Sequence, residues 1–312
     1  MKHSYKILAM TVVLALLSVA AEAQSSRLLV DADWISRHSG NIVVVDVRDG
    51  DAYDEGHIPG AINIPVNDLQ SKPDSILLPI HQVEKLLGEK GLDINKAVVL
   101  YGDGREIAYL EFWMLDYMGM EAIHVLDGGI EQWDGKLTTS ETRLPPSVFR
   151  AKIRPNRYAT TSYVKGALKK HRVVLLDVRT TGEYKGTDVR SLRGGHIPGA
   201  ININFEENYQ GGSSRLKPRE ELEKLYGALD KNKEIIVYCQ TGTRAANTYF
   251  VLKTLGFLNV RAYDASWVVW GTRLDLPAED VSYFNFVSVL KAIKNLEREV
   301  QSLQKSRGGQ SD

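Results

Sequence analysis

The chain of 312 residues repeats itself, and no other feature of the sequence limits its fold as strongly. The stretch IVVVDVR at 42–48 returns as VVLLDVR at 173–179. The nine-residue block GHIPGAINI at 56–64 returns without a change at 195–203. A repeat of this length and fidelity predicts two successive domains that share one fold.

The repeat continues through the rest of both copies. The run AVVLY at 97–101 corresponds to EIIVY at 234–238, and Asp127 and Asp264 occupy matching positions. The offset between the copies is 131 residues at the first pair of segments, 139 at the second and 137 afterwards. Insertions therefore fall in loops, and the largest lies at 185–194 of the second copy.

Both copies alternate short β-rich runs with helical patterns, which predicts α/β domains, each with a parallel sheet flanked by helices. Active sites in such sheets lie beyond the carboxyl ends of the strands. We expect strands at 42–45, 98–101, 122–126, 173–176, 235–238 and 260–263, and helices at 31–37, 80–87, 106–118 and 244–255.

The repeat divides the chain into five segments. We expect a signal peptide at 1–23, the first copy at 24–140, a linker at 141–157, the second copy at 158–280, and a C-terminal helix with a tail at 281–312.

The first segment has the features of an export signal. Lys2 and Lys6 precede the apolar run 7–20, which is short for a membrane span, and Ala21 and Ala23 form a small-x-small cleavage site. This predicts a periplasmic or secreted protein, with an uncleaved anchor as the alternative. Cleavage leaves 37 basic and 38 acidic residues, a formal charge of −1, which does not suggest nucleic acid or an anionic membrane as a partner.

Cys239 is the single cysteine of the chain and follows the buried-strand pattern at 235–238. The helical pattern from Arg244 to about Leu255, closed by Gly256, begins shortly after it. The loop between them, with Gln240, Thr241, Gly242 and Thr243, can turn its backbone N–H groups inward and bind an anion at the positive end of the helix. A helix N-terminus and a nearby arginine also favour a thiolate, which makes Cys239 a candidate nucleophile. The alternative is a buried structural cysteine.

The spacing of Cys239 and Arg244 separates two chemistries. Protein tyrosine phosphatases place five residues between their cysteine and arginine, whereas four intervene here. The loop CQTGTR at 239–244 resembles the active loop of rhodanese-type sulfurtransferases, a family whose members often carry the block GHIPGA as well. The resemblance covers nearly the whole chain after residue 23, and it implies two tandem rhodanese-like domains.

The first copy lacks the nucleophile. Gly102 stands where the second copy has Cys239, and the acidic Asp103 follows it in the loop 102–105. The resemblance implies the same division, with an inactive first domain, a catalytic second domain and an active site near their interface.

Several polar residues occur in both copies, and we interpret them as structural because the inactive copy keeps them. These are Asp46 and Asp177, and His57 and His196. Neither histidine has a second ligand at metal-binding spacing, so no metal and no cofactor is expected.

The arginines of the second copy leave alternatives open. Arg179 has a counterpart in Arg48, which indicates a structural role, but the resemblance implies that it contacts the anionic substrate. Lys185 and Arg190 lie in the insertion, where we favour a solvated loop over the border of the active site.

The resemblance implies sulfur transfer through a persulfide on Cys239, from thiosulfate to cyanide or a thiol. Arg244 would hold the anionic donor. Enzymes of this family that use 3-mercaptopyruvate tend to have an uncharged loop, whereas Arg244 makes this loop charged. Thiosulfate is therefore the expected donor, and 3-mercaptopyruvate is the alternative. A persulfide carrier or sensor for a protein partner is another, and a phosphatase is disfavoured by the loop length.

The repeat stops near residue 280, and an amphipathic pattern follows. It predicts a helix that docks on its own domain, pairs two chains or binds a partner. A short tail is expected from Lys305. The apolar positions are Phe286, Val289, Ile293, Leu296, Val300 and Leu303.

Overall fold

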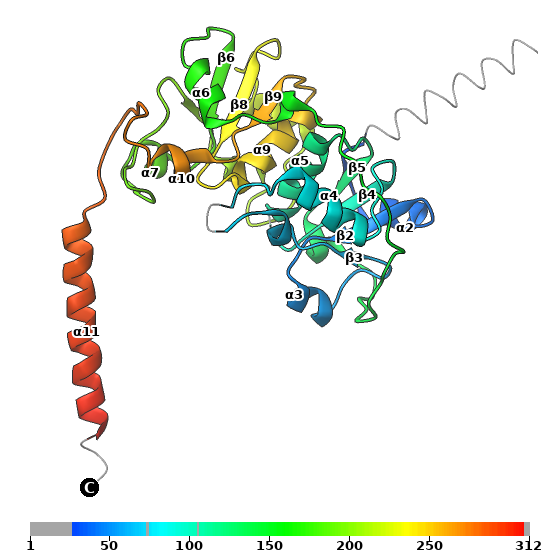
Figure 1. The fold of residues 1–312 in the computed structure, drawn as a ribbon, viewed down its shortest axis with the longest axis horizontal. Helices are drawn as coiled ribbons and strands as arrows, with labels where there is room; N and C mark the ends of the chain where they lie inside the picture. Colours follow the sequence, from blue (N-terminus) through cyan, green and yellow to red (C-terminus); the bar gives the residue numbers. More distant parts are fainter. Residues whose placement is uncertain (1–26, 73–74, 105, 309–312) are drawn as a thin grey trace, which may run out of the picture.

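The computed structural model describes residues 27–72, 75–104 and 106–308, which form two domains side by side followed by a separate helix (Figure 1). The expected signal peptide lies outside the described residues. Among the described residues, no helix has the length and apolar character needed to cross a membrane.

The first domain is built on a parallel sheet of five strands in the order β1-β5-β4-β2-β3. The central strands are apolar along their length because helices cover both faces, as expected for a buried parallel sheet. The strands are β1 (Leu29–Val30), β2 (Ile42–Asp46), β3 (Ile62–Asn63), β4 (Ala97–Tyr101) and β5 (Ile123–Leu126).

The second domain repeats this sheet with four parallel strands in the order β7-β6-β8-β9. A single bridge between Tyr158 and Ala262 takes the place of the strand that β1 provides in the first domain. The last register pairs also match, with Asp46 beside Tyr101 and Asp177 beside Tyr238. The strands are β6 (Val173–Asp177), β7 (Ile201–Asn202), β8 (Glu234–Tyr238) and β9 (Val260–Ala262).

Some of the α-helices begin at a residue whose side chain caps the first turn. The Asp31 carboxylate accepts the Trp34 N–H at 2.8 Å, and the Thr160 hydroxyl accepts the Tyr163 N–H at 3.1 Å. The α-helices are α2 (Ala32–His38), α3 (Gly50–Glu55), α4 (Ile80–Glu89), α5 (Ile107–Met118), α6 (Thr161–Ala167), α7 (Thr181–Tyr184), α8 (Arg219–Leu225), α9 (Thr243–Thr254), α10 (Ser266–Trp270) and α11 (Phe286–Gly308). The 3-10 helices are η1 (Val66–Leu69), η2 (Gly129–Gln132), η3 (Pro155–Arg157) and η4 (Phe205–Asn208).

The expected α/β fold with parallel sheets is confirmed, and each strand and helix expected within the two copies is present within two residues of its predicted ends. The short elements β1, β3, β7, α3, α6, α7, α8 and α10 were not predicted. Two to seven residues are too few to show a periodicity, so their formation depends on the sheet and the loops around them.

The two domains meet through the helices α5 and α9, which follow β4 and β8. The rings of Phe112 and Phe250 pack edge to face with centroids 4.8 Å apart. The Tyr249 hydroxyl donates a hydrogen bond of 2.5 Å to the buried carboxylate of Asp116, which also accepts from Arg154 Nη1 at 2.6 Å. This satisfied polar network inside an apolar contact fixes the register of the two helices.

The repeated aspartates hold the domains together in a symmetric way. Asp264 Oδ2 of the second domain accepts the N–H of Leu77 from the first domain at 2.9 Å. Asp127 Oδ1 of the first domain accepts the N–H of Leu216 from the second at 3.1 Å. Each domain therefore places one loop over the carboxyl-end edge of the other sheet.

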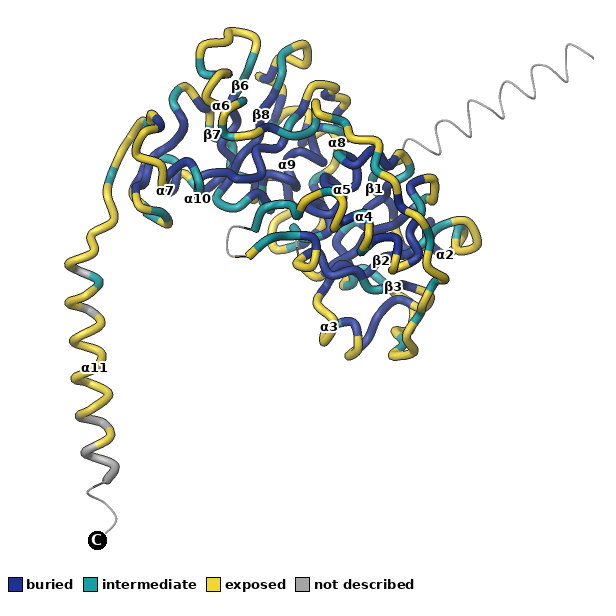
Figure 2. Tube along the Cα trace, in the orientation of Figure 1, coloured by how far each residue is buried: buried dark blue, intermediate teal, exposed yellow. Residues whose placement is uncertain are grey.

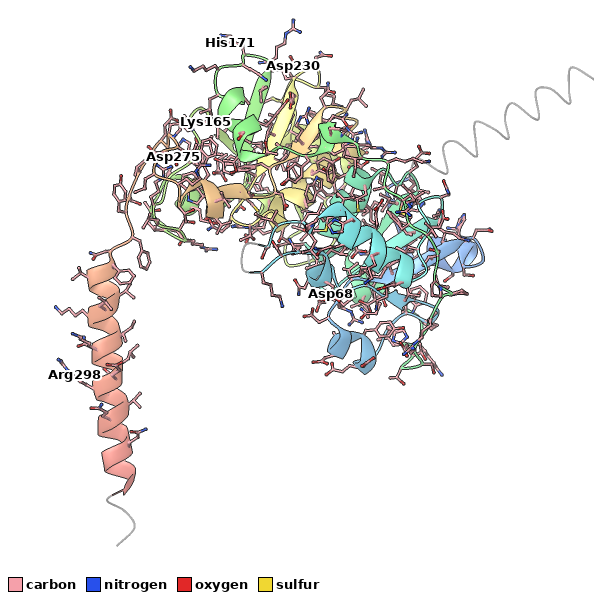
Figure 3. All side chains as sticks on the ribbon, in the orientation of Figure 1. Asp68, Lys165, His171, Asp230, Asp275 and Arg298 are labelled. Carbon is pink, nitrogen blue, oxygen red and sulfur yellow. The ribbon has the colours of Figure 1, made fainter. Side chains whose placement is uncertain are left out.

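The helix α11 extends away from both domains (Figure 1), and Figure 2 shows its described residues as mostly exposed. Figure 3 shows its side chains, with Arg298 among them, standing free of the two sheets. It reaches Gly308, so part of the expected tail is helical. Its described side chains do not pack on its own domain, which is one of the three roles expected for it. Its exposed apolar side chains include Phe286, Val287, Leu290, Ile293, Leu296 and Val300.

Candidate active site

Cys239 lies directly after β8, at the carboxyl end of the central strand, and its side chain is fully buried. Figure 2 shows the surrounding segments β8 and α9 as buried. The Cys239 N–H donates to the Ser266 hydroxyl at 3.2 Å, and the Trp267 N–H donates to the Cys239 carbonyl at 3.0 Å. These contacts fix the backbone of the cysteine on both sides.

The loop after Cys239 directs a backbone N–H at the sulfur. The Gly242 N–H points at Cys239 Sγ with an N–S distance of 3.1 Å. Gly242 has a φ of 94°, and a side chain there would come within 3.0 Å of Asp264, so glycine is required for this turn. Because α9 begins at the next residue, Thr243, the sulfur lies at the positive end of a twelve-residue helix.

Arg244 is fixed beside this loop by a buried carboxylate. Its Nη1 donates to Glu183 Oε2 at 2.7 Å and its Nη2 to Glu183 Oε1 at 2.9 Å. The side chain of Glu183 is 0% exposed and that of Arg244 is 13% exposed. The ring of Phe205 faces the guanidinium at 5.6 Å. A two-fold pairing of this kind is strong and holds the guanidinium in one plane.

The pKa values of the pair reflect this contact. Burial works against the charge of Arg244, but the hydrogen bond to Glu183 and the charge of Cys239 raise its pKa above the usual value. Burial also raises the pKa of the Glu183 carboxyl, yet the hydrogen bonds and charge of Arg244 outweigh it and leave that pKa lowered. Both groups are therefore charged at neutral pH.

The matching position in the first domain has no room for a thiol. A side-chain carbon placed on Gly102 would lie 2.5 Å from Cγ1 of Ile107. Ile107 stands where the second domain has Arg244, and Ala52 stands where it has Glu183. The first domain has thus lost the nucleophile, the arginine and its carboxylate together.

Comparison with known proteins decides the family. The model of the Rhodanese-like domain matches residues 31–136 and 160–273. The chain is 35% identical over 273 residues to a thiosulfate sulfurtransferase of Corynebacterium glutamicum, with 80% of this chain and 90% of that protein covered. A putative thiosulfate sulfurtransferase of Mycobacterium leprae is 35% identical over 274 residues, with 81% and 98% covered. The chain belongs to the rhodanese family.

Solved structures agree with this tandem rhodanese. The 3-mercaptopyruvate sulfotransferase SseA from Escherichia coli superposes with a TM-score of 0.70 at 29% identity, covering 77% of this chain and 99% of that one. The protein EanB, in a structure with a cysteine persulfide and ergothioneine, superposes with a TM-score of 0.74 at 25% identity, covering 81% and 70%.

Arg179 is held inside this rhodanese by the second domain itself. It is 1% exposed, its Nη2 donates to Asp177 Oδ2 at 2.6 Å and to the Gly195 carbonyl at 2.7 Å, and Trp267 faces it at 4.6 Å. Arg48 makes the same two polar contacts in the first domain. The geometry therefore favours the structural interpretation of Arg179 over the predicted contact with substrate.

The repeated histidines are packed in the same way in both copies. His57 stacks on Tyr53 at 3.6 Å and His196 on Tyr184 at 3.7 Å, and Nδ1 of each histidine lies 2.9 Å from the carbonyl oxygen of its tyrosine. These packing contacts explain the presence of both histidines, and no ligand-binding role is needed for either. In the part of the chain that the structure describes, no three His, Cys, Asp or Glu side chains gather as a metal site would require.

The insertion of the second copy contacts the active loop, contrary to the solvated loop that we favoured. The Gln240 amide donates to the Arg190 carbonyl at 3.1 Å and to the Ser191 hydroxyl at 2.9 Å. Arg190 Nε lies 4.0 Å from Glu183 Oε1, while Lys185 is exposed. Arg190 therefore borders the site. The side chains of Thr241 and Thr243 are half-buried on the other part of the loop.

Two residues of the site were missed by sequence reasoning, and the repeat contains a signal for both. Glu183 replaces Ala52 of the first copy, and Ser266 replaces Gly129. Ser266 adopts a φ of 45°, in the region that Gly129 occupies with 66°, and its hydroxyl binds the Cys239 N–H. A serine held in a glycine conformation beside the nucleophile is a costly choice that indicates a local function.

The pH dependence of stability should reveal Asp264, which lies against Gly242. Burial raises the pKa of this carboxyl from 3.8 to about 7, although the Leu77 N–H opposes the shift. Because the folded protein then binds a proton that the unfolded chain has lost, stability falls as pH rises from about 4 to 7. Relative to Asp264→Asn, the wild-type free energy of unfolding should fall by about 1 kcal/mol per pH unit and level off above pH 7.

Urea unfolding of both proteins between pH 5 and pH 8 measures this difference. Asp127→Asn is the control, because Asp127 accepts the matching cross-domain bond. Burial raises the pKa of its carboxyl as well, but the Leu216 N–H and the charge of Arg215 both oppose the shift, so the dependence should be weaker. A difference that stays constant over this range would contradict a pKa of about 7 for Asp264.

Proposed function

We propose that this rhodanese is a sulfurtransferase that takes sulfane sulfur from thiosulfate and passes it to cyanide or a thiol through a persulfide on Cys239. The contact between the Gly242 N–H and Cys239 Sγ carries the proposal, because it places a donor where a charged sulfur forms. The names of the relatives from Corynebacterium and Mycobacterium support thiosulfate as the donor.

The first half-reaction loads the enzyme. The Cys239 thiolate attacks the outer sulfur of thiosulfate, and the bond between the two thiosulfate sulfurs breaks. Sulfite leaves with the electron pair, and the sulfur remains on the enzyme as a Cys–S–S⁻ persulfide, so that charge is conserved. In this proposal the Gly242 N–H and its loop neighbours Gln240, Thr241 and Thr243 hold the new sulfur, and Arg244 supplies N–H groups for the anionic end of the donor.

The second half-reaction removes the sulfur from the enzyme. Cyanide or a thiolate attacks the outer sulfur of the persulfide, the sulfur–sulfur bond breaks, and the electron pair returns to Cys239 as a thiolate. Two half-reactions with separate substrates predict ping-pong kinetics. Neither step, as written, requires a metal or a cofactor.

A 3-mercaptopyruvate sulfurtransferase is the second candidate, supported by the similarity to SseA. The charged loop argues for thiosulfate, since Arg244 lies beside the nucleophile and is ionised. A persulfide carrier for a protein partner is the third candidate function. The exposed helix α11 favours it, because sulfur transfer by the two domains alone gives that helix no role.

Thiocyanate formation from cyanide tests the function with each donor in turn. We expect kcat/KM for thiosulfate to exceed that for 3-mercaptopyruvate by at least about tenfold, a difference of about 1.4 kcal/mol in transition-state stabilisation. The reverse preference would make the protein a 3-mercaptopyruvate enzyme. A stable persulfide without turnover on either donor would favour the carrier.

We also propose that residues 1–23 direct the chain to the periplasm or the exterior and are removed there.

The apolar face of α11 within 286–303 is our proposed docking surface for a second copy or another protein. Ile293 and Val300 lie seven residues apart, with Leu296 between them, a pattern typical of paired helices, and all three are exposed.

A further inference from the structure

Glu183 is a fully buried carboxylate next to the active loop to which the proposed mechanism gives no role. It lies in α7, beside the insertion of the second copy, and 61 residues from Arg244 in the sequence. A carboxylate is costly to bury unless it is paired and hydrogen-bonded. The contacts of Glu183 should therefore explain why a carboxylate is buried at this position.

Those contacts hold Glu183 from two sides. Its Oε2 accepts the Thr180 N–H at 3.2 Å and the Thr180 hydroxyl at 3.1 Å, and the Thr180 hydroxyl also accepts the Glu183 N–H at 3.2 Å. This reciprocal cap fixes the carboxylate before Arg244 meets it. Arg244 then binds the carboxylate from the active-loop side. Its Nη1 donates one N–H to Oε2, and its Nη2 donates one N–H to Oε1.

The pairing leaves part of the guanidinium free for another anion. An arginine has five N–H groups in one plane, and Glu183 uses two of them. Phe205 covers one face of the group, and the two-fold pairing with Glu183 fixes its plane. The remaining N–H groups are thereby held in a fixed orientation, on the residue whose charge acts on Cys239.

Other charges around the pair do not replace Glu183. Arg190 Nε is 4.0 Å from Glu183 Oε1 but is half-exposed and bonded to Asp188. The charges of Arg179 and of Glu106 from the first domain also act on the pair, at longer range. Glu183 is the group in direct contact with the Arg244 fork.

We propose that Glu183 is a positioning residue for sulfur transfer, which orients the Arg244 guanidinium so that its free N–H groups receive the anionic end of the sulfur donor. This inference rests on the proposed function. The first copy supports it as an internal comparison, because the copy without the nucleophile has Ala52 and Ile107 in place of the pair. Carboxylate and arginine are present together or absent together.

Glu183→Gln tests the role with little change in shape. An amide nitrogen cannot accept from Arg244, so the two-fold pairing is broken and the fork is released. We expect KM for thiosulfate to rise about tenfold while kcat changes less than about twofold, because donor binding depends on the orientation of Arg244. An unchanged KM overturns the proposal.

A double-mutant cycle separates orientation from general damage. If Glu183 acts through Arg244, Glu183→Gln added to Arg244→Ala should change KM by less than about twofold beyond Arg244→Ala alone. A further tenfold rise would mean that Glu183 acts independently, which also overturns the proposal. The variant Glu183→Ala/Arg244→Ile controls for folding, because the first domain already folds with Ala52 and Ile107 at these positions.

A third readout needs no donor and stays valid if thiosulfate is the wrong substrate. Removing the negative charge of Glu183 leaves the positive charge of Arg244 uncancelled beside the reacting sulfur. We expect iodoacetamide to alkylate Cys239 about fivefold faster at pH 6 in Glu183→Gln than in wild type, with Cys239→Ser as the blank. Equal alkylation rates and an equal KM would remove Glu183 from the mechanism, whereas an inactive wild type alone would refute only the proposed donor.

Discussion

Replacing Cys239 by serine should lower thiocyanate formation from thiosulfate and cyanide by at least about a thousandfold, which is typical for loss of a catalytic nucleophile. Serine is close to cysteine in shape and its oxygen can accept the Gly242 N–H, so the loop geometry is retained. A hydroxyl is far less nucleophilic than a thiolate and forms no persulfide. The measurement is the initial rate with saturating thiosulfate, together with the mass of the protein after incubation with the donor alone.

Wild type should gain the mass of one sulfur atom in that incubation, and Cys239→Ser should gain none. Cys239 is the one cysteine of the chain, so no other thiol can form a persulfide. An unchanged unfolding midpoint in urea would show that the lost activity does not come from lost structure. Residual activity above about a tenth of wild type would assign the chemistry to another group and refute the persulfide mechanism.

Replacing Arg244 by alanine should affect both activity and stability. We expect kcat/KM for thiosulfate to fall about a hundredfold, equivalent to about 3 kcal/mol, since charge-assisted hydrogen bonds to the donor are lost. Removing one partner of a buried ion pair also leaves Glu183 uncompensated, at a cost of about 3 kcal/mol or more in the free energy of unfolding.

The stability loss in Arg244→Ala should depend on pH. Without Arg244, only the Thr180 N–H and the charge of Arg179 still oppose burial, so the pKa of Glu183 rises and the stability deficit grows as pH increases. Urea unfolding at pH 5 and pH 8 measures this trend. Arg143→Ala is the matched control, because its pair with Glu141 is exposed and should contribute little. Equal stability of wild type and Arg244→Ala at pH 8 would contradict the buried pairing.

The parts of the fold that the sequence predicts are those with a local pattern. The strands β2, β4, β6 and β8 are continuous apolar runs, and the helices α5 and α9 begin after them in matching positions of both copies. Strands of two residues, such as β3 and β7, have no such pattern and form because β2 and β6 offer them partners. The insertion at 185–194 was misjudged because its polar composition is that of a solvated loop, whereas the Gln240 amide binds it to the active loop.

The residues of the candidate site also divide into those that the local sequence brings together and those that only the fold brings together. Cys239, Gly242 and Arg244 lie within six residues, so the order of the sequence alone brings them together at a helix N-terminus. Glu183 was not predicted, because apart from its difference from Ala52 nothing in the sequence distinguishes a glutamate in a short polar segment from a surface residue. Its difference from Ala52 becomes informative only when its contact with Arg244 is known.

The sequence by itself determined the tandem α/β architecture, the loss of the nucleophile in the first copy and the place of Cys239 at the end of a strand. These follow from local periodicity and from the repeat. Only the tertiary structure decided that Glu183 holds Arg244, that Arg179 is engaged by Asp177, and that Asp264 accepts a bond from the other domain. Ion pairs and hydrogen bonds act over a few ångströms in space, and which side chains come that close depends on strand order and domain packing.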